Sequence, residues 1–165
     1  MNYRIKYVSG EPCFDALGVI KLSCVPTVPV NDRIYAQAQL GRNDDSLFIR
    51  ILSFETRPAA NARLSAELCY GGKMLSLSVT ADGRAQADCG ERELSTDLTA
   101  YITRGEDLQG EYWAGVLLFP LETLFTALGA DGSALPLTLS GNILREHPTL
   151  SSAVPLGETV IFTLS

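Results

Sequence analysis

The sequence contains one histidine, and this residue is the first candidate for catalysis. His147 lies in Arg145-Glu-His-Pro-Thr149, so Glu146 could orient its imidazole as a general base for a nearby serine. The chain has no Gly-x-Ser-x-Gly motif or other nucleophile motif to complete such a site. A small hydrolase resting on His147 and Glu146 is therefore the weakest of three functional hypotheses. We expect no enzyme and no catalytic residue.

The other groups that could do chemistry also have structural explanations. The carboxylate pairs Asp44-Asp45 and Glu106-Asp107 could bind calcium or serve glycoside hydrolysis. Both pairs fall in expected turns, where aspartate is favoured for its local hydrogen bonds. The four cysteines include no Cys-x-x-Cys pair and have no histidine cluster beside them, which argues against zinc. We expect no metal and no cofactor.

Composition and charge limit the partners of the chain. Apolar residues make up 46% and charged residues 19% of its 165 residues, as in a globular domain. The net charge is −6 and no basic stripe is present, which argues against nucleic acid as a partner. No apolar run approaches the ~20 residues of a membrane helix, so we expect no membrane partner. The oligomeric state stays open.

The N-terminus bears on localisation. Residues 1–8 alternate polar and apolar residues and lack the apolar run of a secretory signal peptide. We therefore expect a cytoplasmic protein with four reduced thiols, at Cys13, Cys24, Cys69 and Cys89. If Met1 is not the natural start, an extracellular protein with two disulfides is the alternative.

Short segments of alternating polarity, separated by turn residues, run along the whole chain. This period of two is typical of antiparallel strands. Two of the turns carry glycine, at Gly71-Gly72 and at Gly83, where a positive φ is needed. The pattern predicts ten strands, at residues 3–7, 34–40, 47–54, 63–70, 74–80, 85–89, 98–103, 112–119, 135–144 and 159–164.

Two segments have a helical pattern. Leu121–Leu128 has apolar residues at i, i+3, i+4 and i+7, with Pro120 at its first turn and Gly129 just past its end. Glu11–Leu17 is a candidate for one helical turn. The fold class expected is all-β. It is a single antiparallel β-sandwich of the jelly-roll type in one domain, residues 1–165, with one short helix after Pro120.

Trp113 is the only tryptophan, and its strand decides whether it binds a ligand or fills the core. Strand alternation puts Trp113 on the same face as Gly115, Leu117 and Phe119, and its neighbours Tyr112 and Ala114 on the other. A tryptophan that shares a face with large apolar side chains, just before a helix, is typical of a core position. We expect Trp113 to be buried, with its indole N–H in need of a partner.

Five segments, taken in order, resemble those of a known family. They are Asn43–Pro58, Arg63–Tyr70, Leu77–Arg84, Tyr112–Leu124 and Leu139–Pro155. In the first, a polar turn precedes a Leu-Phe-Ile-Arg strand that leads to an acid and a proline. Over roughly residues 14 to 164 this order resembles the family 9-like carbohydrate-binding modules, which are DOMON-like β-sandwiches. The resemblance implies a protein that binds the ends of sugar chains and catalyses no reaction.

The resemblance also implies where a sugar would bind. It implies polar ligand contacts at Glu67 and Asn142, and two tryptophans outside the core that stack on pyranose rings. This sequence has neither tryptophan, and Tyr70, Tyr101 or His147 are the possible substitutes. Arg145 is an additional donor suited to hydroxyls or a carboxylate. The predicted ligand-binding residues, at a loop end, are Glu67, Asn142, Arg145 and His147.

Two functional classes remain ahead of the hydrolase. The leading hypothesis is a non-catalytic binding module for a saccharide or similar polar ligand, because of the order of the segments. The alternative is a structural or protein-interaction β-sandwich that has lost the sugar site, because of the missing tryptophans. Binding of mono- and disaccharides separates the two.

Overall fold

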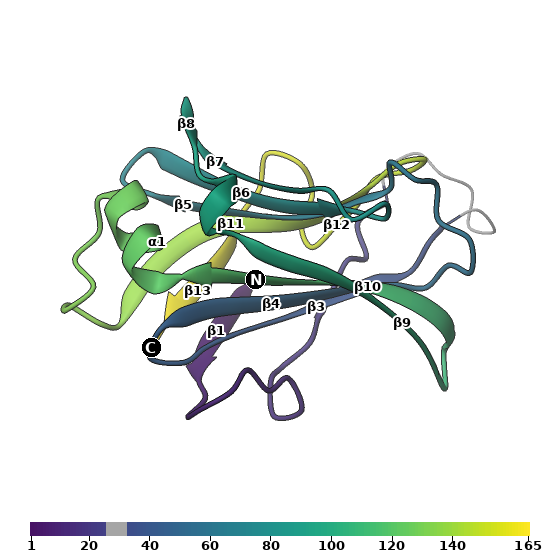
Figure 1. Ribbon diagram of the computed structural model, residues 1–165, viewed down its shortest axis with the longest axis horizontal. Coiled ribbons are helices and arrows are strands. Elements are labelled where there is room, and N and C mark those ends of the chain that lie inside the picture. The colour runs from purple at the N-terminus through teal and green to yellow at the C-terminus, as the bar shows by residue number, and fades with distance from the viewer. Residues whose placement is uncertain (26–32) are drawn as a thin grey trace.

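The strands form two layers that face each other across an apolar core. The computed structural model describes residues 1–25 and 33–165 of the chain. Figure 1 shows β5, β6, β7, β8 and β11 in the upper layer, and β3, β4, β9 and β10 in the lower layer. The expected all-β sandwich is confirmed.

The upper layer continues through β13, with the strand order β8-β7-β6-β5-β11-β13. The short β12 pairs with β11 in the same layer. The bounds are β5 (Arg63–Tyr70), β6 (Lys73–Thr80), β7 (Ala85–Cys89), β8 (Arg92–Glu93), β11 (Leu137–Glu146), β12 (Ser151–Ser152) and β13 (Val160–Leu164).

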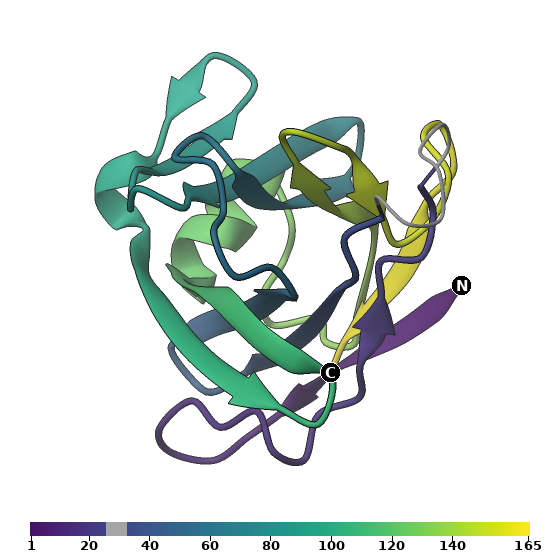
Figure 2. The same ribbon diagram turned by 90° about the vertical axis from the view of Figure 1, so that its right-hand side faces the viewer.

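The lower layer has the order β3-β4-β10-β9, and the short β2 pairs with β3. Figure 2 shows the molecule from the end at which the β9–β10 hairpin lies. The bounds are β2 (Ile20–Lys21), β3 (Ala36–Arg42), β4 (Ser46–Ser53), β9 (Thr99–Asp107) and β10 (Gly110–Pro120).

The strand β1 (Asn2–Tyr7) joins the two layers into one curled sheet. Its first part pairs with β13 and its last two residues pair with β3, and both pairings are parallel. The other strand pairs of the described residues are antiparallel. Alternation reveals which face of a strand is buried but not the direction of its partner. The mixed character at β1 was therefore not expected.

All ten expected strands are present. Two of them, β5 and β7, have the predicted bounds, and the ends of the others are shifted. The short strands β2, β8 and β12 were not expected, because two residues are too few to show a period. The shift that matters for function is at the end of β11, which was expected at residue 144 and lies at Glu146. Arg145 and Glu146 therefore lie on a strand, and only His147 begins the loop.

The core lies between the layers, and Trp113 is part of it. The indole is 1% exposed and belongs to the main apolar cluster together with Leu117 and Phe119. A Cβ on Gly115 would lie 2.5 Å from Cγ1 of Val79 on the opposite layer, so this face of β10 points inward. The expected core position is confirmed. Nε1 of Trp113 has no hydrogen-bond partner among the described residues.

The helix α1 (Leu121–Leu128) has the predicted bounds. Its N-terminus follows the extended Pro120, and its C-terminus is capped by Gly129 with φ 67°, a conformation that glycine adopts without strain. Leu121, Leu124 and Leu128 are buried, and α1 covers the end of the core opposite the β9–β10 hairpin (Figure 1). No helix in the described ranges has the length and apolar character needed to span a membrane.

The expected turn at Glu11–Leu17 is present as a single hydrogen-bonded turn, in which the Leu17 N–H donates to the Phe14 carbonyl over 3.1 Å, and the segment forms no helix. Phe14 and Leu17 pack on Phe48 and Val116, on the outward face of the lower layer. Both side chains are therefore buried without a helix.

The four cysteines are unpaired. Cys13 is exposed, Cys24 and Cys69 are partly buried, and Cys89 is buried. The Cys89 thiol lies 3.5 Å from the Ala127 carbonyl.

Candidate functional site

The outward face of the upper layer is polar. On β5 the core residues Leu64, Ala66 and Leu68 alternate with residues that point away from the core. Directly opposite residues on neighbouring strands share a face, so the register brings the outward residues together. The polar residues among them include Arg63, Ser65 and Glu67 of β5, Ser76, Ser78 and Thr80 of β6, Gln86 and Asp88 of β7, and Asn142 and Glu146 of β11. Leu144, Cys69 and Met74 share this face with them.

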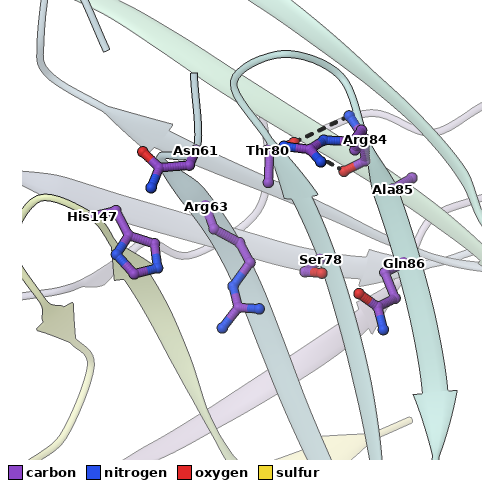
Figure 3. Close-up of a pocket in the computed structure, with 8 residues that line it drawn as sticks. All are labelled: Asn61, Arg63, Ser78, Thr80, Arg84, Ala85, Gln86 and His147. Atoms are coloured by element: carbon purple, nitrogen blue, oxygen red, sulfur yellow. Dashed lines mark hydrogen bonds between the residues drawn. The ribbon is translucent and has the colours of Figure 1, made fainter. Parts of the chain in front are cut away.

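A cavity of about 630 Å³ lies where this face meets three loops. The loops precede β5, connect β6 to β7, and follow β11. Figure 3 shows Arg63 with His147 on one side and Ser78 and Gln86 on the other. The lining residues are Asn61, Arg63, Ser78, Thr80, Arg84, Ala85, Gln86 and His147. Seven of the eight carry polar side chains, so the cavity can hydrogen-bond a polar ligand.

Both arginines of the cavity have acidic neighbours. Nε of Arg63 donates to Oε2 of Glu146 over 2.7 Å, directly across the β5–β11 pair. Nη2 of Arg84 lies 3.0 Å from Oδ2 of Asp82 in the β6–β7 turn. Thr80 fixes this turn, because its hydroxyl accepts from the Arg84 N–H (Figure 3). The same hydroxyl also contacts the Asp82 carboxylate. These contacts hold both guanidinium groups at the cavity.

His147 is the only one of the four predicted site residues that lines the cavity. It is exposed and follows β11 directly, with φ 63°, a left-handed conformation that is uncommon outside glycine. This conformation ends the strand and turns the side chain toward Arg63 (Figure 3).

Glu67 lies on the same face but outside the cavity lining, paired with Asn142 on one side and Ser76 on the other. Partial burial raises the pKa of the Glu67 carboxyl, and the nearby Glu146 carboxylate raises this pKa further. The Arg63 guanidinium acts in the opposite direction. A hydroxyl ligand at this end of the face would find an acceptor in Glu67.

Asn142 uses its amide to hold a neighbouring segment. The side chain is 5% exposed, and its Nδ2 donates to the Val154 carbonyl over 3.1 Å. Its Oδ1 accepts from the N–H groups of Ile143 and Val154. These bonds connect β11 to the segment after β12, which accounts for Asn142 without a ligand.

Arg145 lies inside the molecule, not at the loop end where the sequence led us to expect it. Its side chain is fully buried, because position 145 points into the sandwich like Ile143. Nε lies 3.1 Å from Oγ of Ser53, the last residue of β4 in the lower layer, and 3.0 Å from Oε2 of Glu55, which follows that strand. Nη1 donates to the Thr149 carbonyl over 2.9 Å. This geometry is that of a connection between layers, and a role of Arg145 in binding stays a prediction.

The cavity residues other than His147 were not found from the sequence. Arg63, Ser78, Thr80 and Gln86 occupy alternate polar positions in predicted strands, and this was the available signal. The register that places them together depends on strand pairing, which alternation does not give. No three histidine, cysteine, aspartate or glutamate residues within 1–25 and 33–165 are grouped to hold a metal ion.

Of the three residues expected to replace the missing tryptophans, His147 lines the cavity, and the two tyrosines lie elsewhere. Tyr70 ends β5 and packs on the core, and Tyr101 is 49% exposed on β9 in the other layer. A row of aromatic rings does exist on that layer. Phe54 contacts Tyr35 and Tyr112, with ring centroids 5.4 and 5.7 Å apart. None of these rings lines the cavity on the upper layer.

Comparison with solved structures identifies the fold. A "putative carbohydrate-binding protein" from Bacteroides uniformis superposes with a TM-score of 0.73 at 14% identity, over 99% of each chain. A family 9 carbohydrate-binding module from Caldicellulosiruptor kristjanssonii in complex with glucose has a TM-score of 0.68 at 8% identity, over 98% of this chain and 95% of the module. The chain shares their fold. A complex of a family 9 module from the same organism with cellotriose gives 0.67 at 9% identity, over 100% of this chain and 94% of the module.

No family model matches the sequence of this chain, and no curated protein matches it. The likeness is therefore one of three-dimensional structure, and it agrees with the resemblance seen in the order of segments.

Proposed function

We propose that this protein is a non-catalytic binding module for a saccharide, and that the ligand occupies the cavity on the outward face of the upper layer. The observation that carries the proposal is the lining of this cavity. Amide, hydroxyl and guanidinium groups converge there from three strands and three loops. Ligand sites are concave and contain a few well-placed polar groups, and saccharide hydroxyls both donate and accept hydrogen bonds.

The fold supports the same class of ligand. Proteins with this fold include family 9 modules in complex with glucose and with cellotriose. A fold alone does not determine function, so the proposal rests on the polar cavity and uses the fold as support.

Thermal unfolding in the presence of sugars tests the proposal. A ligand at one hundred times its dissociation constant stabilises a protein by about 2.7 kcal/mol, so a panel of mono- and disaccharides should include at least one that raises the midpoint. Gln86→Ala should weaken that ligand roughly three- to tenfold, as expected for one lost hydrogen bond. Gln109→Ala is the matched control, because Gln109 is exposed in the β9–β10 turn and outside the cavity.

The second candidate is a structural or protein-interaction sandwich. The observation in its favour is that His147 carries the only ring among the cavity residues, so no indole is available to stack on a pyranose. If no sugar changes the midpoint, this second candidate replaces the first.

The proposal that the protein is not an enzyme has its own test. Oligosaccharides incubated with the protein should show no release of new reducing ends. Release that is lost in His147→Ala would establish the hydrolase hypothesis instead.

A further inference from the structure

We infer that the cavity prefers acidic saccharides, namely sugars that carry a carboxylate, over neutral ones. The inference rests on the proposed function, since it names the class of saccharide for the same cavity. It follows from the charges of the lining, from the free donors of its arginines, and from the kind of contact that a sugar can make there.

The ionisable residues of the lining are two arginines and one histidine. Arg63, Arg84 and His147 line the cavity, and none of the eight lining residues is acidic. The chain as a whole has a net charge of −6, so this composition is opposite in sign to the average of the molecule. A carboxylate in the cavity would meet cationic donors on more than one side.

Acidic residues do lie next to the cavity, and their contacts leave donors free. Glu146 is bound by Nε and Nη2 of Arg63, and Asp82 by Nε and Nη2 of Arg84. In both arginines the ion pairs use Nε and Nη2, and Nη1 takes no part in them. Each guanidinium therefore keeps donors for a second acceptor. Glu67 lies farther along the face and outside the lining.

The two ion pairs are also partly solvated. The side chains of Arg63 and Arg84 are 41% and 75% exposed. Exposed ion pairs contribute little to stability, so sharing or exchanging the acceptor requires little free energy. A ligand carboxylate that accepts two parallel N–H bonds from a guanidinium forms one of the stronger hydrogen bonds available to a protein.

A neutral sugar has less to gain at this site. Neutral pyranoses bind largely through stacking on flat aromatic side chains, together with hydrogen bonds to their hydroxyls. Apart from the His147 ring, the lining offers no aromatic face. Charge-assisted hydrogen bonds must therefore supply the affinity that stacking does not, which favours a ligand with a carboxylate.

Isothermal titration with glucuronate, its methyl ester and glucose tests the inference on the whole chain. The ester keeps the sugar ring and its hydroxyls but replaces the charged carboxylate with a neutral and slightly larger ester group. We expect glucuronate to bind at least tenfold more tightly than the ester or glucose, and its affinity to fall as NaCl is raised from 20 to 300 mM. Arg84→Gln should remove most of this difference. Because the Arg84 side chain is exposed, the variant should stay folded, and its melting temperature checks this.

The possible outcomes distinguish a failure of the carboxylate preference from a failure of the saccharide site itself. If the acid and the ester bind equally, the preference for a carboxylate is wrong and a saccharide site remains. If glucuronate, its ester and a wider panel of acidic and neutral sugars all fail to bind, both proposals are wrong. If sodium acetate binds as tightly as glucuronate, the cavity is a general anion site and the inference of a sugar ligand is overturned.

Discussion

Arg145 and His147 are two positions apart, yet their side chains lie in opposite environments. The first is fully buried and contacts Ser53 of the other layer and Glu55 just after it, and the second is exposed at the cavity. The boundary between them is the end of β11 at Glu146. The Arg145 guanidinium, which could have donated hydrogen bonds to a ligand, instead connects the two layers.

Arg145→Ala should lower the free energy of unfolding by about 3 kcal/mol, because it leaves the Glu55 carboxylate nearly buried and without its partner. Arg84→Ala, at a side chain that is 75% exposed, should change the free energy by no more than about 0.5 kcal/mol. Urea denaturation measures both. An Arg145→Ala protein as stable as the parent would show that the buried pair contributes nothing to folding.

Glu67 gives a prediction on pH dependence. The pKa of Glu67 is raised from its ordinary value of 4.5, mainly by burial and then by Glu146. The folded state therefore binds the proton more tightly than the unfolded state does. The stability that Glu67 contributes is fully present below the unfolded pKa and is lost as the pH rises through the folded pKa.

Glu67→Gln should therefore be more stable than the parent at pH 7, and the difference should disappear as the pH approaches about 4. Thermal midpoints of the two proteins between pH 3.5 and 8 measure this. Glu158→Gln, at an exposed position in the turn before β13, controls for the loss of one negative charge. A Glu67→Gln variant less stable at pH 7 would mean that the carboxylate is favoured by its surroundings.

At the scale of the elements, the pairing of β5 with β11 places the predicted residues Glu67 and Asn142 opposite each other. Gly141 permits this pairing. A Cβ at position 141 would lie 1.8 Å from the Glu67 carbonyl oxygen, which is backbone and cannot turn away. The strands approach each other at this point more closely than any side chain allows.

Gly141→Ala should destabilise the protein by roughly 1–3 kcal/mol or more, because the two strands must move apart. Gly18→Ala is the matched control, since a Cβ there meets only Tyr3 at an ordinary distance of 3.7 Å. Its effect should stay within about 0.5 kcal/mol. Chemical denaturation followed by circular dichroism measures both. Equal stabilities of the two variants would contradict the tight β5–β11 approach.

Strands with a clear alternation, and the helix with its proline and glycine ends, could be predicted from the sequence because these signals are local. Arg63–Tyr70 and Leu121–Leu128 have the predicted bounds. The cavity could not be predicted, because it depends on which strands are neighbours and in which register. The burial of Arg145 could not be predicted either. A charged residue near the end of a strand pattern indicates the start of a loop, whereas β11 continues to Glu146.

In the molecule as a whole, the environment of Trp113 depends on both layers, because its indole lies in the core between them. Its ring is 1% exposed, and its own strand, β10, pairs with β4 and β9 in the lower layer. The next glycine on the same face, Gly115, faces Val79 of the upper layer. Loss of packing between the layers would therefore expose the indole to water.

If the two layers unfold together, the fluorescence of Trp113 and the far-ultraviolet circular dichroism should change at the same denaturant concentration. Trp113→Ala should destabilise the protein by about 3–5 kcal/mol, whereas Tyr101→Ala, at a side chain 49% exposed, should change little. A fluorescence transition that precedes the circular dichroism transition would show that the layers separate before the strands are lost.

The position of β1 between β13 and β3 has a consequence for synthesis. The Ser165 hydroxyl donates to the Ile5 carbonyl over 160 positions of sequence, beside the β1–β13 pair. A nascent chain leaves the ribosome from its N-terminus, so β1 waits on the order of ten seconds for residues 160–164 to emerge. During this wait one edge of β1 has no strand to pair with. Arg4 and Lys6 place charges on β1, and charges on an unpaired edge discourage pairing with other chains.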